Sequence, residues 1–181
     1  MAVASTLIKE VETERTRLVS LVEQLTDEQA TFKPLPEVWS VNEKLEHLVL
    51  AETSGVSKIW SAAEGLRKMK PVWVGEHTNR GLLIEDVISR TWKAKEIAPP
   101  IATPHISGPL SYWLEYFLLS QDLLRKLGLL LEGLDLQAAV FPHFLCGPLD
   151  AGQRIEFLRF HMVRHRKQIE SMMADPDFPV A

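Results

Sequence analysis

The sequence lacks the features that mark secreted and membrane-spanning proteins. Cys146 is the single cysteine among 181 residues, so no internal disulfide can form and a reducing compartment is expected. Residues 1–10 have neither a basic start nor a long apolar centre, so we expect no signal peptide. The most apolar stretch, residues 110–134, is interrupted by charged side chains and offers no uncharged run long enough to cross a bilayer. We therefore expect a cytoplasmic protein without membrane association.

A basic surface pattern and the familiar catalytic motifs are also absent. The formal net charge is -4, and no run of Lys or Arg forms a stripe, so no nucleic-acid partner is expected. The chain has no Ser-His-Asp signature, no phosphate-binding loop and no paired-carboxylate pattern. The sequence therefore names no general base and no substrate clamp.

The sequence does contain the helical pattern of a folded domain. Its composition, 46% hydrophobic and 24% charged, is that of a globular protein, and its length fits one domain spanning residues 1–181. Apolar residues recur at spacings of three and four, which predicts amphipathic helices. The expected helices are residues 5–25, 40–68, 110–131 and 149–174, with a shorter one at 82–96.

The remaining segments are expected to be turns and loops. Ser40 and Glu43 match a capping box at the start of the second long helix. Residues 26–29 could form a short helical turn, and prolines and glycines favour a loop over residues 133–148. No segment combines strand alternation with turn signals over more than a few residues. The predicted fold is all-α, a four-helix bundle with one shorter additional helix.

Two histidines lie in the apolar stripe of the last predicted helix. His161 and His165 fall on the same side as Leu158, Met162 and Ile169. A spacing of four places one imidazole above the other, so both could reach a single metal ion about 2.0–2.1 Å away. The alternative is a pair of core histidines hydrogen-bonded to neighbouring groups. A shared cation would satisfy both rings at once.

A third ligand is harder to identify from periodicity. His47 lies far from the apolar stripe of its own helix, so its position predicts a solvent-exposed side chain. His143 and Cys146 immediately precede the last helix and could complete a site, although a loop histidine and a buried cysteine are more often structural. His77 and His105 lie in predicted loops and are expected at the surface.

Two sequence blocks carry a resemblance to a known family. Residues 39–48 begin with Trp-Ser and end in His-Leu, and Gly147-Pro148-Leu149 leads into His161-x-x-x-His165-x-x-Gln168-Ile169. These blocks resemble the DinB/YfiT-like superfamily of helical bundles, described as metal-dependent hydrolases, over roughly residues 5–173. The resemblance implies a three-histidine site in which His47, His161 and His165 hold a divalent transition metal.

The resemblance also implies the kind of metal and its surroundings. Zinc or nickel is most often found in such proteins, with iron, cobalt or manganese as alternatives, and imidazole ligands do not choose among these metals. Gln168 could orient a ligand or bound water, or be an ordinary boundary residue. Glu43 could accept the second ring proton of His47, although capping the helix explains it at least as well.

Three functions remain open at this point. The first is a metal-dependent hydrolase acting on a small molecule, because three protein ligands leave coordination positions vacant. The second is a thiol-dependent S-transferase or isomerase that uses a low-molecular-weight thiol. The third is a non-enzymatic, metal-binding dimeric bundle. The resemblance implies a homodimer, with residues 112–119 as a candidate interface, and Trp39, Trp60, Trp92 and Trp113 are expected to pack the bundle.

Overall fold

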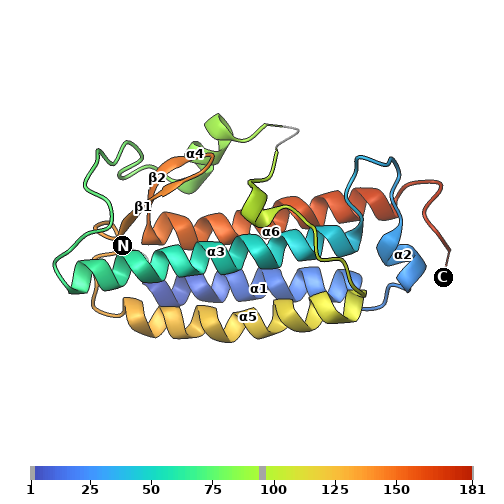
Figure 1. Ribbon diagram of the computed structural model, residues 1–181, viewed down its shortest axis with the longest axis horizontal. Coiled ribbons are helices and arrows are strands. Elements are labelled where there is room, and N and C mark those ends of the chain that lie inside the picture. The colour runs from blue at the N-terminus through green and yellow to red at the C-terminus, as the bar shows by residue number, and fades with distance from the viewer. Residues whose placement is uncertain (1–2, 94–96, 181) are drawn as a thin grey trace.

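Four long helices form the body of the protein. The computed structural model describes residues 3–93 and 97–180. Helices α1 and α3 each pack against both α5 and α6, which gives a four-helix bundle (Figure 1). The all-α prediction is thus confirmed. The long helices are α1 (Ala4–Val22), α3 (Val41–Arg67), α5 (Leu110–Leu131) and α6 (Ala151–Met173).

The helix boundaries follow the local signals in the sequence. Ser40 caps α3 and Asp150 caps α6, each through a complete capping box. The predicted capping box of Ser40 and Glu43 is therefore confirmed. Helix α5 begins at Leu110, immediately after Pro109, which has no amide N–H to donate to a preceding turn.

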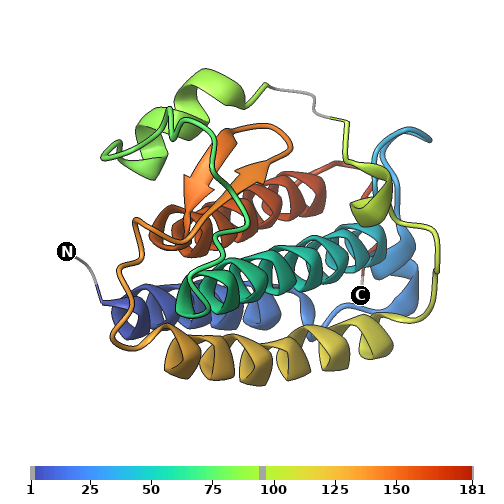
Figure 2. The ribbon, with the colours of Figure 1, turned by 60° about the vertical axis from the view of Figure 1, so that its left-hand side comes forward.

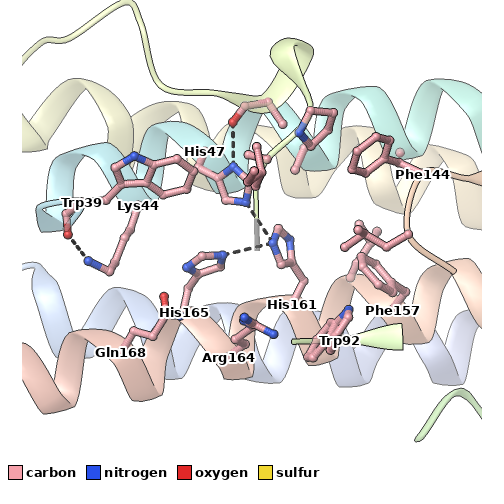
Figure 3. A pocket seen from close by; sticks show the side chains of 18 of the residues that line it. Trp39, Lys44, His47, Trp92, Phe144, Phe157, His161, Arg164, His165 and Gln168 are labelled. Atoms are coloured by element: carbon pink, nitrogen blue, oxygen red, sulfur yellow. Dashed lines mark hydrogen bonds between the residues drawn. The ribbon is translucent and has the colours of Figure 1, made fainter. Parts of the chain in front are cut away.

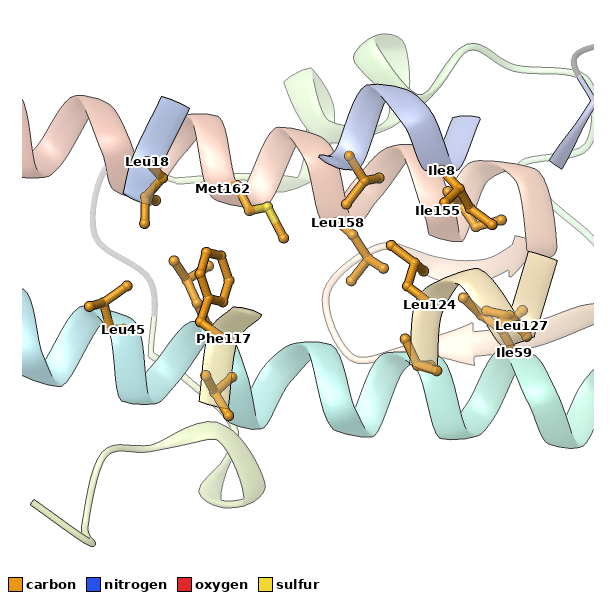
Figure 4. Packing of buried hydrophobic residues seen from close by; sticks show 14 of the residues in the cluster. Ile8, Leu18, Leu45, Ile59, Phe117, Leu124, Leu127, Ile155, Leu158 and Met162 are labelled. Atoms are coloured by element: carbon orange, nitrogen blue, oxygen red, sulfur yellow. The ribbon is translucent and has the colours of Figure 1, made fainter. Parts of the chain in front are cut away.

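The apolar stripes of the four helices meet in one core. Figure 4 shows Leu45 and Ile59 of α3, Phe117 of α5 and Ile155 of α6 directed toward the interior between the helices. Trp113 is also buried in this core, as predicted. This packing fixes α3 and α6 side by side, and both helices carry candidate ligands.

Among the described residues, three short helical elements lie outside the bundle. They are α2 (Asp27–Thr31), α4 (Ile84–Thr91) and the 3-10 turn η1 (Pro100–Ala102). The helix predicted for residues 82–96 is shorter than expected, because the backbone becomes extended at Trp92 and that ring packs against Phe157. The last three residues of that prediction, 94–96, lie outside the described residues.

A β-hairpin replaces part of the loop predicted for residues 133–148. Strands β1 (Val140–His143) and β2 (Gly147–Asp150) pair antiparallel, with Pro142 opposite Pro148. The loop prediction was wrong for these residues because proline and glycine, which normally indicate loops, occupy the pairing positions. Gly147 has φ +72°, a left-handed conformation that favours glycine at the end of the turn.

The hairpin and α4 share a second, smaller core with α6. Ile84 and Val87 of α4 pack with Leu149 of β2 and Phe157 of α6. Figure 2 shows both elements on the side of the bundle away from α5. They therefore build a wall beside the face of α6 that carries His161. Within the described ranges, every helix is too short or too polar to cross a lipid bilayer.

Candidate metal centre

Three histidine side chains converge between α3 and α6. The Nε2 atom of His161 lies 3.0 Å from Nε2 of His47 and 3.1 Å from Nε2 of His165. Their candidate ligand atoms all lie within 4.8 Å of one another, so the cluster could hold a metal ion. Figure 3 shows the three rings facing a common point. The structure thus brings together the three residues named from the sequence.

His47 is held in one tautomer by a backbone carbonyl. Its Nδ1 lies 2.6 Å from the oxygen of Ala102, and because a carbonyl only accepts, the ring proton must be on Nδ1. The Nε2 atom therefore presents a lone pair toward His161. A hydrogen bond of this kind is the usual support of a metal-bound histidine.

The prediction that His47 is solvent-exposed was wrong, since only 6% of the residue is accessible. The segment that contains η1 lies along the outer face of α3 and covers the ring. Glu46 holds this segment in place. Its buried carboxylate accepts hydrogen bonds from the amides of His105, Ile106 and Ser107 at 2.5, 2.7 and 3.1 Å. A helix-period pattern cannot detect a loop that packs from a distant part of the chain.

Burial favours the neutral form of all three imidazoles. It lowers the pKa of His47, and the hydrogen bond to Ala102 offsets this only in part. Burial lowers the pKa values of His161 and His165 well below the ordinary value, and the neighbouring histidines act in the same direction. Neutral imidazole is the form that donates a lone pair to a metal.

Proton counting favours a cation at the centre of the cluster. A neutral imidazole has one N–H, so an N–H on Nε2 of His161 could bond only one of its two neighbours. A cation accepts a lone pair from each ring instead. Ligands at 2.0–2.1 Å with tetrahedral or octahedral angles have nitrogen atoms roughly 2.9–3.4 Å apart, which matches the observed separations.

The two residues expected to support the ligands lie in different surroundings. Gln168 lies next to His165 (Figure 3), and its side chain slightly offsets the lowering of the pKa of that histidine. Glu43 instead accepts a hydrogen bond from the Ser40 amide at 2.7 Å and pairs with Lys33 at 2.9 Å. The acceptor at Nδ1 of His47 is Ala102, so Glu43 is not the group placed there.

The cluster opens into a large cleft. The cleft has a volume of about 810 Å³, within the range of small-molecule sites. Trp39 and Trp92, which the sequence assigned to packing, line it, and so does Phe157. These wall residues could not be identified from the sequence, because Trp92 and Phe157 meet only after α4 has folded onto α6.

One buried amine lies in the wall of the cleft. Lys44 is 3% exposed, and its Nζ donates to the carbonyl oxygen of Trp39. Burial lowers the pKa of Lys44 to about 8. This lysine could therefore exchange a proton near neutral pH. It was missed from the sequence, because a lysine one residue after a capping glutamate normally indicates a solvated helix turn.

The other histidines lie apart from the cluster. His105 is exposed, as predicted, whereas His77 is half-buried, with Nε2 3.4 Å from Oε1 of Gln153. His143 also lines the cleft, at 4.3 Å between its ring centroid and that of Phe157. Cys146 is buried beside Thr91. Among the described residues, the cluster suited to a metal consists of the three histidines on α3 and α6.

Comparison with known proteins agrees with this geometry. The family model described as the DinB superfamily matches residues 10–169, which covers α3, α6 and all three histidines. No curated protein and no solved structure matches the chain. The match extends over most of the sequence. The chain therefore belongs to the DinB superfamily.

Proposed function

We propose that this protein binds one divalent transition metal through His47, His161 and His165 and uses it to hydrolyse a small molecule. The observation that carries the proposal is the convergence of three Nε2 atoms on the wall of a cleft of about 810 Å³. Zinc or nickel is the proposed metal, with iron, cobalt or manganese as alternatives. A cation with three imidazole ligands and a vacant position supplies Lewis acidity, which lowers the pKa of a coordinated water or thiol.

The residues of the chain supply the surroundings of this reaction. Ala102 orients His47, and the walls formed by Trp39, Trp92 and Phe157 exclude water from a bound substrate. Nζ of Lys44 is the proposed site of proton exchange, because its pKa of about 8 lies near the working pH.

Thiol-dependent S-transfer or isomerisation is the second candidate. The size of the cleft favours it, because about 810 Å³ leaves room for a low-molecular-weight thiol beside a second small molecule. The same histidine cluster would serve this chemistry, with a thiol in place of water. We also propose a cytoplasmic homodimer that has no nucleic-acid or membrane partner.

Metal analysis of untagged protein prepared without nickel resin tests the proposed site. Wild type and the control His105→Ala, which alters an exposed histidine, should each retain about one metal per chain. His47→Ala and His161→Ala should lose at least about 90% of it, because two imidazoles hold a divalent ion far less tightly than three. Equal, negligible metal in all four proteins would contradict the proposal.

Activity assays on the metal-loaded protein separate the candidate functions. A panel of small esters and amides tests hydrolysis, and conjugation of electrophiles with small thiols tests S-transfer. Turnover of an ester or amide that is lost in His161→Ala supports the first function. Turnover in the thiol assays alone would favour thiol-dependent S-transfer over hydrolysis. Metal binding without turnover in either assay would support a non-enzymatic bundle.

A further inference from the structure

The cleft contains a buried arginine that has no acidic partner among the residues that the structure describes. Arg154, in the first turns of α6, is 6% exposed and lines the cleft. One terminal nitrogen donates to the oxygen of Pro142 at 3.1 Å, and Nε is buried without a hydrogen-bond partner. Throughout residues 3–93 and 97–180, no carboxylate lies within ion-pair distance of this guanidinium. Burial of an unpaired guanidinium is unfavourable, so its position calls for an explanation.

Comparison with the other buried arginine shows how unusual this is. Arg15 is 1% exposed and pairs with Glu52 at 2.5 Å. The protein therefore supplies an acidic partner for Arg15, the buried guanidinium whose contacts lie within the bundle. Burial lowers the pKa of Arg154 to about 10, so the side chain remains cationic at neutral pH. An anion from outside the chain would complete its environment.

A second cation lies near Arg154. Nζ of Lys58 is 5.5 Å from the centroid of the Phe141 ring, and Cζ of Arg154 is 5.8 Å from the same centroid. Lys58 also lines the cleft, and it forms no ion pair with any residue that the structure describes. Two positively charged residues of the cleft wall, one on α3 and one on α6, thus lie near the same aromatic ring.

His143 adds a neutral donor to the same end of the cleft. Its Nδ1 accepts hydrogen bonds from the amides of Leu145 and Cys146, each at 3.2 Å, so the ring proton must be on Nε2. Burial and the charges of Arg154 and Lys58 lower the pKa of His143 to about 3, which keeps this tautomer neutral. The Nε2–H group is therefore a fixed hydrogen-bond donor in the cleft wall.

The charges along the cleft are arranged asymmetrically. Within the described ranges, the acidic residues that line it are Glu37 and Asp175, which lie before α3 and after α6, at the end opposite Arg154. His161 lies seven positions after Arg154 on α6, which corresponds to about 10 Å along the helix axis. The ring of Phe157 lies between, 4.3 Å from the centroid of His143 and 5.8 Å from that of His161.

We propose that Arg154, Lys58 and His143 form a carboxylate-binding end of the cleft, and that the molecule acted on at the histidine cluster carries its carboxylate there. A planar guanidinium with further N–H donors suits a carboxylate, which accepts two hydrogen bonds side by side. The substrate is then a small carboxylic acid with an apolar middle that passes Phe157 and a reactive group at the far end. This identification of the substrate rests on the proposed function, whereas the anion site itself does not.

Calorimetric binding measurements on the metal-free full chain at pH 7 test the anion site separately from metal chemistry. The probes are 4-phenylbutyrate, its neutral amide 4-phenylbutanamide, and 3-phenylpropylphosphonate. Wild type should bind the carboxylate at least about tenfold more tightly than the amide, as expected for a charge-assisted pair. Equal binding of these two probes, no detectable binding of the carboxylate, or a phosphonate bound about tenfold more tightly would overturn the proposal.

Variants assign the preference to the proposed residues. Arg154→Met should reduce the carboxylate preference to about twofold or less, and Lys58→Met should reduce it by about threefold or more. Arg125→Met, which alters an exposed arginine on α5 outside the cleft, should keep it. If Arg154→Met fails to fold by circular dichroism, Lys58→Met decides alone. An unchanged preference in either folded variant would contradict the proposal, whatever the metal content of the protein.

Discussion

Buried charged side chains differ in the partner that the chain supplies. Arg15 of α1 pairs with Glu52 of α3 and also donates to the carbonyl oxygen of Phe117 of α5, so its contacts link three helices through the core. Lys44 donates to a backbone carbonyl, and Arg154 has no carboxylate within ion-pair distance among the described residues. The pair of Arg15 and Glu52 stabilises the bundle, whereas Lys44 and Arg154 lie on the cleft wall, where a bound molecule can reach them.

Removal of Arg15 should strongly destabilise the bundle. Arg15→Met leaves Glu52 buried without its partner, and burial already raises the pKa of that carboxyl. The free energy of unfolding in urea at pH 7 should fall by about 3–5 kcal/mol, and the double variant Arg15→Met/Glu52→Leu should recover most of the loss. Arg125→Met breaks an exposed pair with Glu12 and should cost less than about 1 kcal/mol. Equal effects of Arg15→Met and Arg125→Met would refute this assignment.

The stability contributed by Lys44 should depend on pH. Its pKa is about 8 in the folded protein and about 10.4 in an unfolded chain, so the unfolded state binds more protons between these values. The free energy of unfolding should therefore rise with pH through this window, and the cost of burying the charge is fully present below pH 8.

Lys44→Met lacks this dependence. At pH 7 the variant should be more stable than wild type by up to about 3 kcal/mol, and the difference should shrink toward pH 10. Urea denaturation of the metal-free proteins at several pH values measures this difference in the free energy of unfolding, with Lys167→Met, which alters an exposed lysine, as the control. A difference that is independent of pH would show that Lys44 is not titrating in the folded state.

At the scale of elements, local periodicity predicted the long helices and little of what surrounds them. Apolar spacing and capping residues identified α1, α3, α5 and α6, because these signals act within a few turns of the chain. The hairpin was missed because its pairing residues include Pro142, Gly147 and Pro148. The positions of His161 and His165 on one helix face were predictable, since a helix places residues four apart on one side.

The third ligand could be named only from the family resemblance. His47 lies off the apolar stripe of α3, and it is buried because the segment around η1 covers it. That contact joins residues 55 positions apart, which a pattern within one helix does not record. The carboxylate-binding residues were missed for a similar reason, since His143, Lys58 and Arg154 come from three separate elements.

The segment around η1 should control metal affinity through Glu46. Glu46→Ala removes the acceptor of three loop amides, so the loop should loosen and release the carbonyl that orients His47. Zinc affinity, measured by competition with a chelator, should fall about 10–100-fold. Hydrogen exchange of the amides at residues 105–107 should become faster.

Glu43→Ala is the matched control for this prediction. It removes a carboxylate from the same helix, where the structure places it in the cap and in the pair with Lys33. Stability should fall by about 1 kcal/mol, while zinc affinity stays within about twofold. A loss of zinc affinity in Glu43→Ala equal to that in Glu46→Ala would instead assign Glu43 to the support of His47.

For the whole molecule, the outer face of α5 is the candidate subunit interface. Tyr112, Tyr116, Leu119 and Leu123 recur at spacings of four and three and are 48%, 41%, 67% and 41% exposed. An exposed apolar stripe of this kind is typical of an interaction surface. It lies on the far side of the bundle from the hairpin and α4, so a partner there would leave the cleft open (Figures 1 and 2).

Light scattering after size-exclusion chromatography tests the predicted homodimer. Wild type should elute with twice the mass of one chain, and Leu119→Glu should shift it to the monomer, because a buried carboxylate without a partner disfavours association. Val74→Glu, at an exposed loop position that is 88% accessible, should remain dimeric. A monomeric wild type, or a Leu119→Glu variant that still dimerises fully, would exclude this interface.

An anomalous-difference map from a crystal of the zinc-loaded protein, recorded at the zinc absorption edge, would locate the metal ion itself. We expect one strong peak about 2.0–2.1 Å from the Nε2 atoms of His47, His161 and His165, with a coordination position open to the cleft. A map without a peak between α3 and α6, or with a peak beyond bonding distance of the Nε2 atom of His47, would contradict the three-histidine site.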